Sequence, residues 1–415
     1  MATYKEQNKL NVPHLRFPKF YGEWCVSTIG EQFDLYSGNT PSRLNKEHFE
    51  GNVNWITSGE LKEHYISDTK EKISEDAATA NNLKLLHPGT FVIAIYGLEA
   101  DGVRGTGSIT CKESTISQAC MAFTQKGDVK NEFLYSWYKK HGNIIGIKYA
   151  QGTKQQNLSY DILEKFHIAF PSQDEQDKLI KFISLLDERI ATQSKLIEKL
   201  ESLIKGLNDF LYTQYGDEVL TSFAELGTSY SGLSGKSAQD FGSGKPFITY
   251  LNVYSNNVIK ENDFQYVAIK DDEKQNVVKY GDVLFTLSSE TPEEVGVGSV
   301  YLGKEKVYLN SFCFGIHITN TEVVFPPYLS YYVSLTAFRK FIYPYAQGST
   351  RFNLCKADFE KASIKLPTLA DQKQIYSVLG HIDCKIETER QMLKLYNSQK
   401  QYLLCLLYTS DAADE

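Results

Sequence analysis

The residues of this chain best suited to chemistry lie in a polar loop that begins with glycine and occurs twice. It reads GTKQQN at 152–157 and GSTRFN at 348–353. Lys and Arg can bind phosphate or guanine, Asn and Gln can read adenine, and glycine lets backbone amides approach a phosphate. These residue types indicate a DNA contact, although one such loop alone is also typical of a plain polar turn. The candidate contact residues are Lys154, Gln155, Gln156, Asn157, Thr350, Arg351 and Asn353.

A second polar turn also occurs twice, as SGNTPSR at 37–43 and SGLSGKS at 231–237. It adds the DNA-contact candidates Asn39, Thr40, Ser42, Arg43 and Lys236. The Gly-Lys pair in the second copy invites a P-loop interpretation. A P-loop needs glycine five residues before that pair, where this chain has Tyr230, so no nucleotide site is predicted.

Other motifs that could support catalysis fail on their residue types. The string FPPY at 325–328 resembles the amine-binding motif of amino-methyltransferases, but Phe325 replaces the polar residue that would hold the amine. The eight histidines show no metal-ligand spacing, and the acidic cluster at 290–294 is more typical of a solvated loop. We therefore expect no catalytic residue, no metal and no cofactor in this chain.

The elements that position these loops are themselves duplicated. Residues 149–200 align with 345–396 at a constant offset of 196, and 14 of the 52 positions are identical. This period is too long for a solenoid repeat, so it indicates a duplicated domain with its helix. Short apolar runs bounded by Gly, Asn and Asp, such as 91–95 and 283–287, predict strands. The fold class is therefore α/β (α+β).

Two long helices are predicted at about 173–212 and 369–404. Each begins after a proline, with Ser172 and Glu175 forming a capping box and Thr368 and Asp371 a near version of it. Apolar residues then recur at alternating spacings of 3 and 4, which is a coiled-coil seam and favours pairing of the two helices over simple packing on one domain. The seam residues are Ile183, Leu186, Ile190, Gln193, Ile197, Leu200, Ile204, Leu379, Ile382, Ile386, Glu389 and Leu393. From 183 to 211 the first helix would span about 42 Å.

Composition limits the class of protein. The chain has 415 residues, enough for two or more domains, and a net charge of −7, so any DNA contact must depend on local basic loops or on a basic partner. Seven cysteines without a CxxC pair indicate free thiols in a reducing cytoplasm. We find no apolar run long enough for a membrane span and no leader, so a cytoplasmic protein without membrane contact is expected.

The sequence from 405 to 415 differs from the rest. The repeat and its heptads continue through about Leu404, and the string CLLYTSDAADE then breaks the register. That string resembles a translated sequencing adapter, so we expect a non-native tail.

Together these patterns resemble the DNA-specificity (S) subunit of type I restriction–modification systems. The resemblance covers about 15–404 and is carried by Trp24 with IGE at 29–31, by SGNTPS at 37–42 and by WITSGEL at 55–61. The duplicated QG(T/S)xxxNL loops and P-x-x-x-(E/D)-Q helix starts complete it. The second half lacks an equivalent of Trp55, which blurs which of its loops touch bases.

The resemblance implies two target recognition domains, at 15–158 and 217–354, each followed by a conserved region with a spacer helix, at 159–212 and 355–404. The two helices would pair antiparallel, and each domain would read one half of a split double-stranded DNA site. Two methyltransferase (M) subunits would bring S-adenosylmethionine, and two restriction (R) subunits would use ATP and Mg²⁺.

Two other classes of protein are alternatives to a specificity subunit. A self-contained restriction or methylation enzyme would methylate DNA without partners. A coiled-coil adaptor unrelated to DNA would leave no sequence-specific footprint even with M subunits present.

Overall fold

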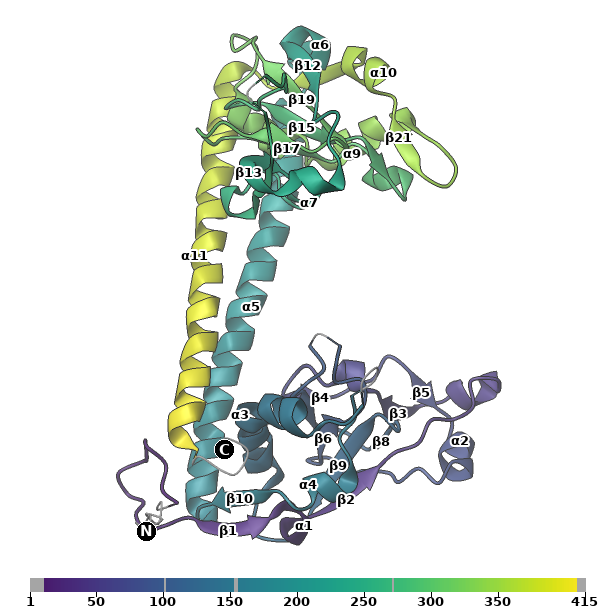
Figure 1. Ribbon diagram of the computed structural model, residues 1–415, viewed down its shortest axis with the longest axis vertical. Coiled ribbons are helices and arrows are strands. Elements are labelled where there is room, and N and C mark those ends of the chain that lie inside the picture. Colours follow the sequence, from purple (N-terminus) through teal and green to yellow (C-terminus); the bar gives the residue numbers. More distant parts are fainter. Residues whose placement is uncertain (1–10, 101, 153–155, 271, 409–415) are drawn as a thin grey trace. The chain divides into compact units, whose positions relative to one another are not determined.

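The computed structural model describes residues 11–100, 102–152, 156–270 and 272–408, and it divides into two compact units. Unit 1 comprises Met1–Ser194 with Gln391–Glu415, and unit 2 comprises Lys195–Arg390. Each unit contains one mixed α/β domain together with part of both long helices, α5 (Gln173–Tyr215) and α11 (Leu369–Leu407) (Figure 1). Within these ranges, no helix has the length and apolar character needed to cross a membrane.

The domain of unit 1 is built on a five-stranded sheet. Its strand order is β2 (Phe33–Ser37), β9 (Cys120–Gln125), β6 (Phe91–Ala94), β7 (Gly107–Thr110) and β4 (Tyr65–Ile66). Helix α3 (Asn131–Tyr149) packs on β6, β7 and β9. Phe91, Phe123 and Phe133 are at most 2% exposed and lie in the same core. The predicted strand at 91–95 is thus a central strand, as its continuous apolar run requires.

A small lobe carries the turn that follows β2. It is a three-stranded sheet of β5 (Lys72–Ile73), β3 (Val53–Ile56) and β8 (Ser114–Ile116), flanked by η1 (Lys46–Phe49) and α2 (Glu75–Ala80). Trp55, Ile73 and Ala77 form its own buried core, against which Phe49 packs. The lobe therefore gives the 37–43 turn a support separate from the main sheet.

Unit 2 repeats this plan with different residues. Its main sheet has the order β12 (Gly227–Ser231), β19 (Cys313–Ile318), β15 (Val283–Thr286) and β17 (Gly298–Val300). Its second sheet has the order β14 (Gln265–Val267), β13 (Phe241–Ile248) and β18 (Tyr308–Leu309). The short helices α8 (Leu329–Tyr332) and α9 (Thr336–Ile342) follow at the chain position that α3 has in unit 1.

The remaining elements are short. They are β1 (Cys25–Thr28), α1 (Ile29–Gln32), η2 (Ser58–Glu60), α4 (Tyr160–Leu163), β10 (His167–Phe170), β11 (Val219–Ser222), α6 (Phe223–Leu226), η3 (Ala238–Asp240), α7 (Tyr250–Ser255), η4 (Glu261–Asp263), β16 (Ser288–Ser289), η5 (Pro292–Glu294), η6 (Pro326–Tyr328), η7 (Tyr343–Tyr345), β20 (Ala346–Gln347), β21 (Phe352–Leu354), α10 (Lys356–Lys361) and β22 (Ser363–Leu366).

Both long helices begin where the sequence predicts, and a buried glutamine fixes each start. Gln176 donates to the carbonyls of Asp128 and Pro171 and accepts from the backbone N–H of Lys130. Its repeat equivalent, Gln372, makes the same three bonds, to Val323, Pro367 and Phe325. Since both side chains are fully buried, this residue ties each helix to its own domain.

The helix caps differ between the two copies. The hydroxyl oxygen of Thr368 accepts from the Asp371 N–H at 3.2 Å and donates to its carboxylate at 2.6 Å, as a cap requires. In the other copy Glu175 is 2% exposed and its carboxylate binds Arg16 in a bidentate ion pair. The acidic residue of the predicted capping box therefore ties the N-terminal segment to α5 within unit 1.

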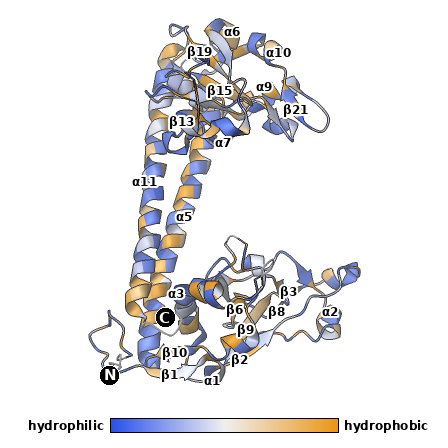
Figure 2. Ribbon diagram, in the orientation of Figure 1, coloured by the Kyte–Doolittle hydropathy of each residue, from blue (hydrophilic) through white to orange (hydrophobic). Residues whose placement is uncertain are grey.

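The long helices run antiparallel inside each unit. In unit 1, Asp187 of α5 bonds Lys400 of α11 and Arg189 bonds the hydroxyl of Tyr396, so rising numbers on one helix meet falling numbers on the other. In unit 2, Glu201 pairs with Arg390. All twelve predicted seam residues are buried or half-buried. Figure 2 shows hydrophobic and hydrophilic residues interspersed along both helices, as amphipathic helices require.

The last turn of α11 packs into the domain of unit 1. Leu404, Leu407 and Tyr408 are at most 2% exposed, and the ring of Tyr408 lies 5.2 Å from that of Phe133. Residues 409–415 lie outside the described part of the chain, so the origin of the 405–415 segment stays a prediction. Its first residues nevertheless contribute to a core.

Candidate nucleic-acid interface

The QG loop is a hairpin with the same backbone connections in both units. In unit 2, β20 and β21 pair with each other and β16 pairs with β21. In unit 1, Asn157 forms bridges with Gln151 and Tyr96. The N–H of Leu158 donates to Ile95 at 2.9 Å, and that of Leu354 donates to Leu287 at 2.8 Å. The hairpin is therefore anchored to the end of a central strand, β6 or β15, in each domain.

The glycine that opens each hairpin is required by its backbone. Gly152 and Gly348 have φ values of 113° and 144°, in the region that side chains with a Cβ rarely adopt. A Cβ on Gly348 would also lie 2.1 Å from the carbonyl oxygen of Arg351. The glycine thus sets the hairpin conformation and leaves the following residues to vary.

In unit 1 the described part of this hairpin is held by its own domain. Gln156 accepts from Arg104 through its side chain at 2.9 Å, and its backbone N–H donates to Glu99 at 2.8 Å. Gln156 and Asn157 are both half-buried. The candidates Lys154 and Gln155 lie outside the described residues.

In unit 2 the hairpin presents its side chains to solvent. Thr350, Arg351 and Asn353 are all exposed, and the guanidinium of Arg351 lies 5.9 Å from the ring centre of Phe312, which is itself 56% exposed. Arg351 and Phe312 also line a pocket of about 320 Å³ next to α7 and β16. A cation beside exposed aromatic rings suits a planar, electron-rich ligand such as a base.

The second predicted turn is also positioned by an equivalent glycine in each unit. A Cβ on Gly38 would lie 1.8 Å from the carbonyl oxygen of Ile116, and one on Gly232 would lie 2.0 Å from that of Asn310. In unit 1 the Asn39 side chain accepts from the backbone N–H of Thr40 at 2.8 Å, which shapes the turn. Asn39 and Ser42 are exposed and Thr40 is half-buried.

The basic residue of this turn is paired with a glutamate in both units, with opposite exposure. Arg43 forms a bidentate pair with Glu71, and its side chain is 58% exposed. These hydrogen bonds raise the pKa of Arg43 and lower that of Glu71. The side chain of Lys236 is 8% exposed, and its ammonium group binds Glu273 and, at 2.6 Å, the carbonyl of Ala268. Arg43 can therefore reach a ligand, whereas the position of Lys236 favours a structural role.

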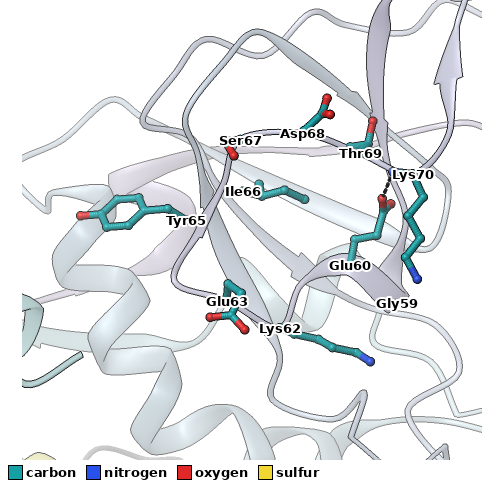
Figure 3. Close-up of a pocket in the computed structure, with 10 residues that line it drawn as sticks. All are labelled: Gly59, Glu60, Lys62, Glu63, Tyr65, Ile66, Ser67, Asp68, Thr69 and Lys70. Atoms are coloured by element: carbon teal, nitrogen blue, oxygen red, sulfur yellow. Dashed lines mark hydrogen bonds between the residues drawn. The ribbon is translucent and has the colours of Figure 1, made fainter. Parts of the chain in front are cut away.

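A shallow pocket of about 500 Å³ beside β4 has mixed charge (Figure 3). Lys62 and Lys70 line it together with three carboxylates, and that of Glu60 accepts from the Lys70 N–H at 2.7 Å. Carboxylates repel phosphate, so the pocket adds little to a DNA surface. The described residues contain no group of His, Cys, Asp and Glu placed to hold a metal ion, and all seven cysteines are free.

Several residues at these sites were not predicted from the sequence. Glu71, Glu273 and Phe312 lie far along the chain from the basic side chains they contact. The two glutamates also occupy different positions along the repeat. Glu71 precedes the edge strand β5, whereas Glu273 follows its counterpart β14, so the repeat does not predict either of them.

The comparisons with known proteins agree with this architecture. The family model described as "Type I restriction modification DNA specificity domain" matches residues 21–202 and 227–395. The MjaVIII specificity subunit of Methanocaldococcus jannaschii is 23% identical over 430 residues, covering 99% of this chain and 97% of that protein. The MjaIX specificity subunit from the same organism is 25% identical over 303 residues, covering 67% and 69%.

Solved structures share the fold. The S subunit of a type I restriction–modification system from M. genitalium superposes with a TM-score of 0.53 at 16% identity, covering 96% of this chain and 99% of that one. A chain from a study of type I R-M complex assembly and conformational transition gives a TM-score of 0.58 at 15% identity, covering 92% and 96%.

The two-domain fold with duplicated loops and a paired helix from each repeat is that of a DNA-recognition subunit. The chain belongs to the family of type I restriction–modification DNA-specificity subunits.

Proposed function

We propose that this chain reads a two-part DNA site, one part with each domain, and carries the catalytic subunits of its complex on the long helices. The chain itself would supply no catalytic group. Methyltransferase subunits would bring S-adenosylmethionine, and restriction subunits would bring ATP and Mg²⁺.

The observation that supports this most directly is the contrast between backbone and side chains. Two domains hold the QG hairpin by equivalent bonds, Leu158 to Ile95 and Leu354 to Leu287. The residue types that follow the glycine differ in sequence, with KQQ at 154–156 in one copy and TRF at 350–352 in the other. One frame with two sets of side chains is what reading two different half-sites requires.

Exposed apolar residues on the helices support the docking of partner subunits. Leu196, Leu203 and Phe210 recur every seven residues on α5 in unit 2 and are 39% to 58% exposed. A spacing of seven places them on one side of the helix. On α11 in unit 1, Met392, the repeat equivalent of Leu196, is exposed together with Leu395 and Tyr402. Each unit thus offers exposed apolar residues on a long helix, which suits one docking partner for each unit, hence two M subunits, with two R subunits joining them.

The charge of the chain also favours a shared DNA surface. With a net charge of −7, this protein is poorly suited to neutralise phosphates by itself. We infer that the partner subunits supply much of the backbone contact. If the chain alone bound its site as tightly as the complex, with an equal salt slope, this inference would be wrong.

The decisive experiment is methylome sequencing of a host that expresses this chain with its M subunit. We expect methylation within a split motif that has an unread gap. Arg351→Ala should weaken methylation at that motif while the complex still assembles, because Arg351 is exposed and packs on no core. Methylation by the chain without partners would favour a self-contained enzyme, and a complex that gives no sequence-specific footprint would favour a simple adaptor.

The spacer role has a separate test. Insertion of one heptad in α5, with a matching heptad in α11 to preserve their pairing, should lengthen the unread gap. An unread gap of unchanged length would exclude the helices as the spacer.

A further inference from the structure

We propose that Arg43 reads a guanine in the half-site bound by the first domain, and that Glu71 is the residue that orients it. This inference rests on the proposed function and identifies where the specificity of the first domain originates.

The guanidinium of Arg43 is fixed from two directions. Glu71 binds both of its Nη atoms, at 2.7 Å for the Nη2 to Oε2 bond. The ring centre of Phe49 lies 4.5 Å from Cζ, and that of the buried Trp55 lies 5.5 Å away. Stacking and pairing together restrict a side chain that would otherwise sample many rotamers.

Glu71 is itself held in place by the small lobe. The hydroxyl of Thr69 donates to the Glu71 carbonyl at 2.7 Å and accepts from the backbone N–H of Trp55 at 3.3 Å. Trp55 is 2% exposed at the centre of the lobe, and its indole N–H donates to the carbonyl of Asn39 at 3.2 Å. The backbone of Glu71, through Thr69, and the turn that carries Arg43 are therefore both held by hydrogen bonds to the same buried residue, Trp55.

This arrangement favours a base over a phosphate. Glu71 cancels the charge of Arg43, which weakens attraction to the DNA backbone. End-on pairing uses one N–H on each Nη atom, so three of the five donors remain, including the adjacent Nε and Nη pair. A guanidinium edge of fixed direction matches O6 and N7 of guanine, the commonest specific contact in the major groove.

The neighbouring residue supports the same orientation. Leu44 is 97% exposed, at the tip of a turn closed by the Asn45 N–H and the Ser42 carbonyl. A leucine presented in this way is poorly matched to water and to phosphates. It suits the apolar edge of a base pair beside the guanine, such as a thymine methyl group.

The second domain provides a natural control. Lys236 occupies the equivalent turn and also pairs with a glutamate, but its side chain is buried and its ammonium group donates to the backbone of its own domain. The same turn thus reads DNA in one copy and stabilises the fold in the other.

The test uses the complete complex of this chain with its M subunit, acting on DNA in which each base pair of the wild-type site is varied in turn. Arg43→Ala should reduce the preference for guanine at one position of one half-site by about 5-fold to 150-fold. Arg43→Lys should lose that preference equally, because lysine keeps the charge but lacks the planar fork. Preferences in the other half-site should not change. Leu44→Ala should relax the adjacent position.

Glu71→Gln separates positioning from a structural role. It should lower the guanine preference and make binding more dependent on salt by about one counterion, because Arg43 becomes free to attract phosphate. The matched control Lys236→Ala should lower the melting temperature and leave every base preference intact. Melting and assembly of each Arg43 variant show whether the variant is folded.

Three results would overturn the proposal. They are a first half-site without guanine, an Arg43→Lys variant with wild-type preferences, and an Arg43→Ala variant that weakens binding uniformly across sequences. A wild-type complex that discriminates between no sequences would instead refute the proposed function itself.

Discussion

Asp187 lies at the centre of a buried charge cluster in unit 1, and its replacement with asparagine should destabilise that unit. One carboxylate oxygen binds Lys400 of α11, and the other lies 3.4 Å from Nδ1 of His64. The three side chains are 18%, 12% and 10% exposed. Asparagine keeps the shape of the side chain, so the variant isolates the loss of charge.

The expected magnitude follows from burial. Breaking a buried ion pair by removing one partner costs about 3–5 kcal/mol, and the partial exposure of Asp187 favours the lower value, about 3 kcal/mol. For a unit of this size, 1 kcal/mol shifts the melting temperature by about 2–4 °C. The expected decrease is therefore about 6–12 °C. Lys139 adds to the cost, because burial and the nearby Lys400 lower its pKa to about 8 and the charge of Asp187, which the variant removes, opposes that lowering.

The assay is thermal unfolding of the purified full chain followed by circular dichroism. The control is Glu201→Gln, which breaks a pair between the same two helices with both partners exposed, 45% and 49%. An exposed pair contributes about 0–1 kcal/mol, so this control should melt within about 4 °C of wild type. Equal shifts in the two variants would refute the reasoning that burial sets the strength of the Asp187 cluster.

Three further predictions concern single features of the fold. Burial lowers the pKa of His64, but its hydrogen bond to Glu132 and its contact with the Asp187 carboxylate outweigh burial and raise that pKa above 6.5, so its stabilising contribution is complete below pH 6.5 and is lost as the pH rises through the raised pKa. Denaturant unfolding between pH 6 and 7.5 should show this loss in wild type and not in His64→Phe; higher pH is avoided because Lys139, with its pKa of about 8, then changes stability in the opposite sense. Gln176→Leu and Gln372→Leu should each cost about 3 kcal/mol in urea titrations, because each leaves buried backbone groups unpaired. Gly348→Ala should abolish protection of the second half-site in footprinting while the first half-site stays protected, and loss of both would contradict independent hairpins.

The sequence predicts the scaffold well because the helix starts and the central strands depend on residue patterns that are local in the chain. Helix starts depend on a proline, a cap and a glutamine within a few residues, and the helices begin at Gln173 and Leu369 as expected. Strands such as β6 and β15 are continuous apolar runs, which need only burial to be recognised. Repetition at a constant offset then doubles the signal.

The site was less predictable because its chemistry depends on partners distant in the chain. Arg43 and Lys236 look alike in sequence, as basic residues in equivalent turns. Their roles separate only when Glu71 and Glu273 are placed beside them and their exposures, 58% and 8%, are known. Solvent exposure of a basic side chain is a tertiary property that no local pattern contains.

The duplication therefore constrains backbone geometry more strongly than side-chain chemistry. Gly38 and Gly232 both approach a strand carbonyl too closely for any Cβ, and Gln176 and Gln372 make equivalent bonds. In the turns and hairpins next to these conserved positions, the residue types differ between the two copies, and so do the residues that they contact. A domain that keeps such a frame can acquire a new half-site by changing a few exposed residues, since the bonds that hold the frame do not pass through them. In this chain the exposed arginine lies on the turn of the first domain and on the hairpin of the second, so we expect the two half-sites to be read by different loops.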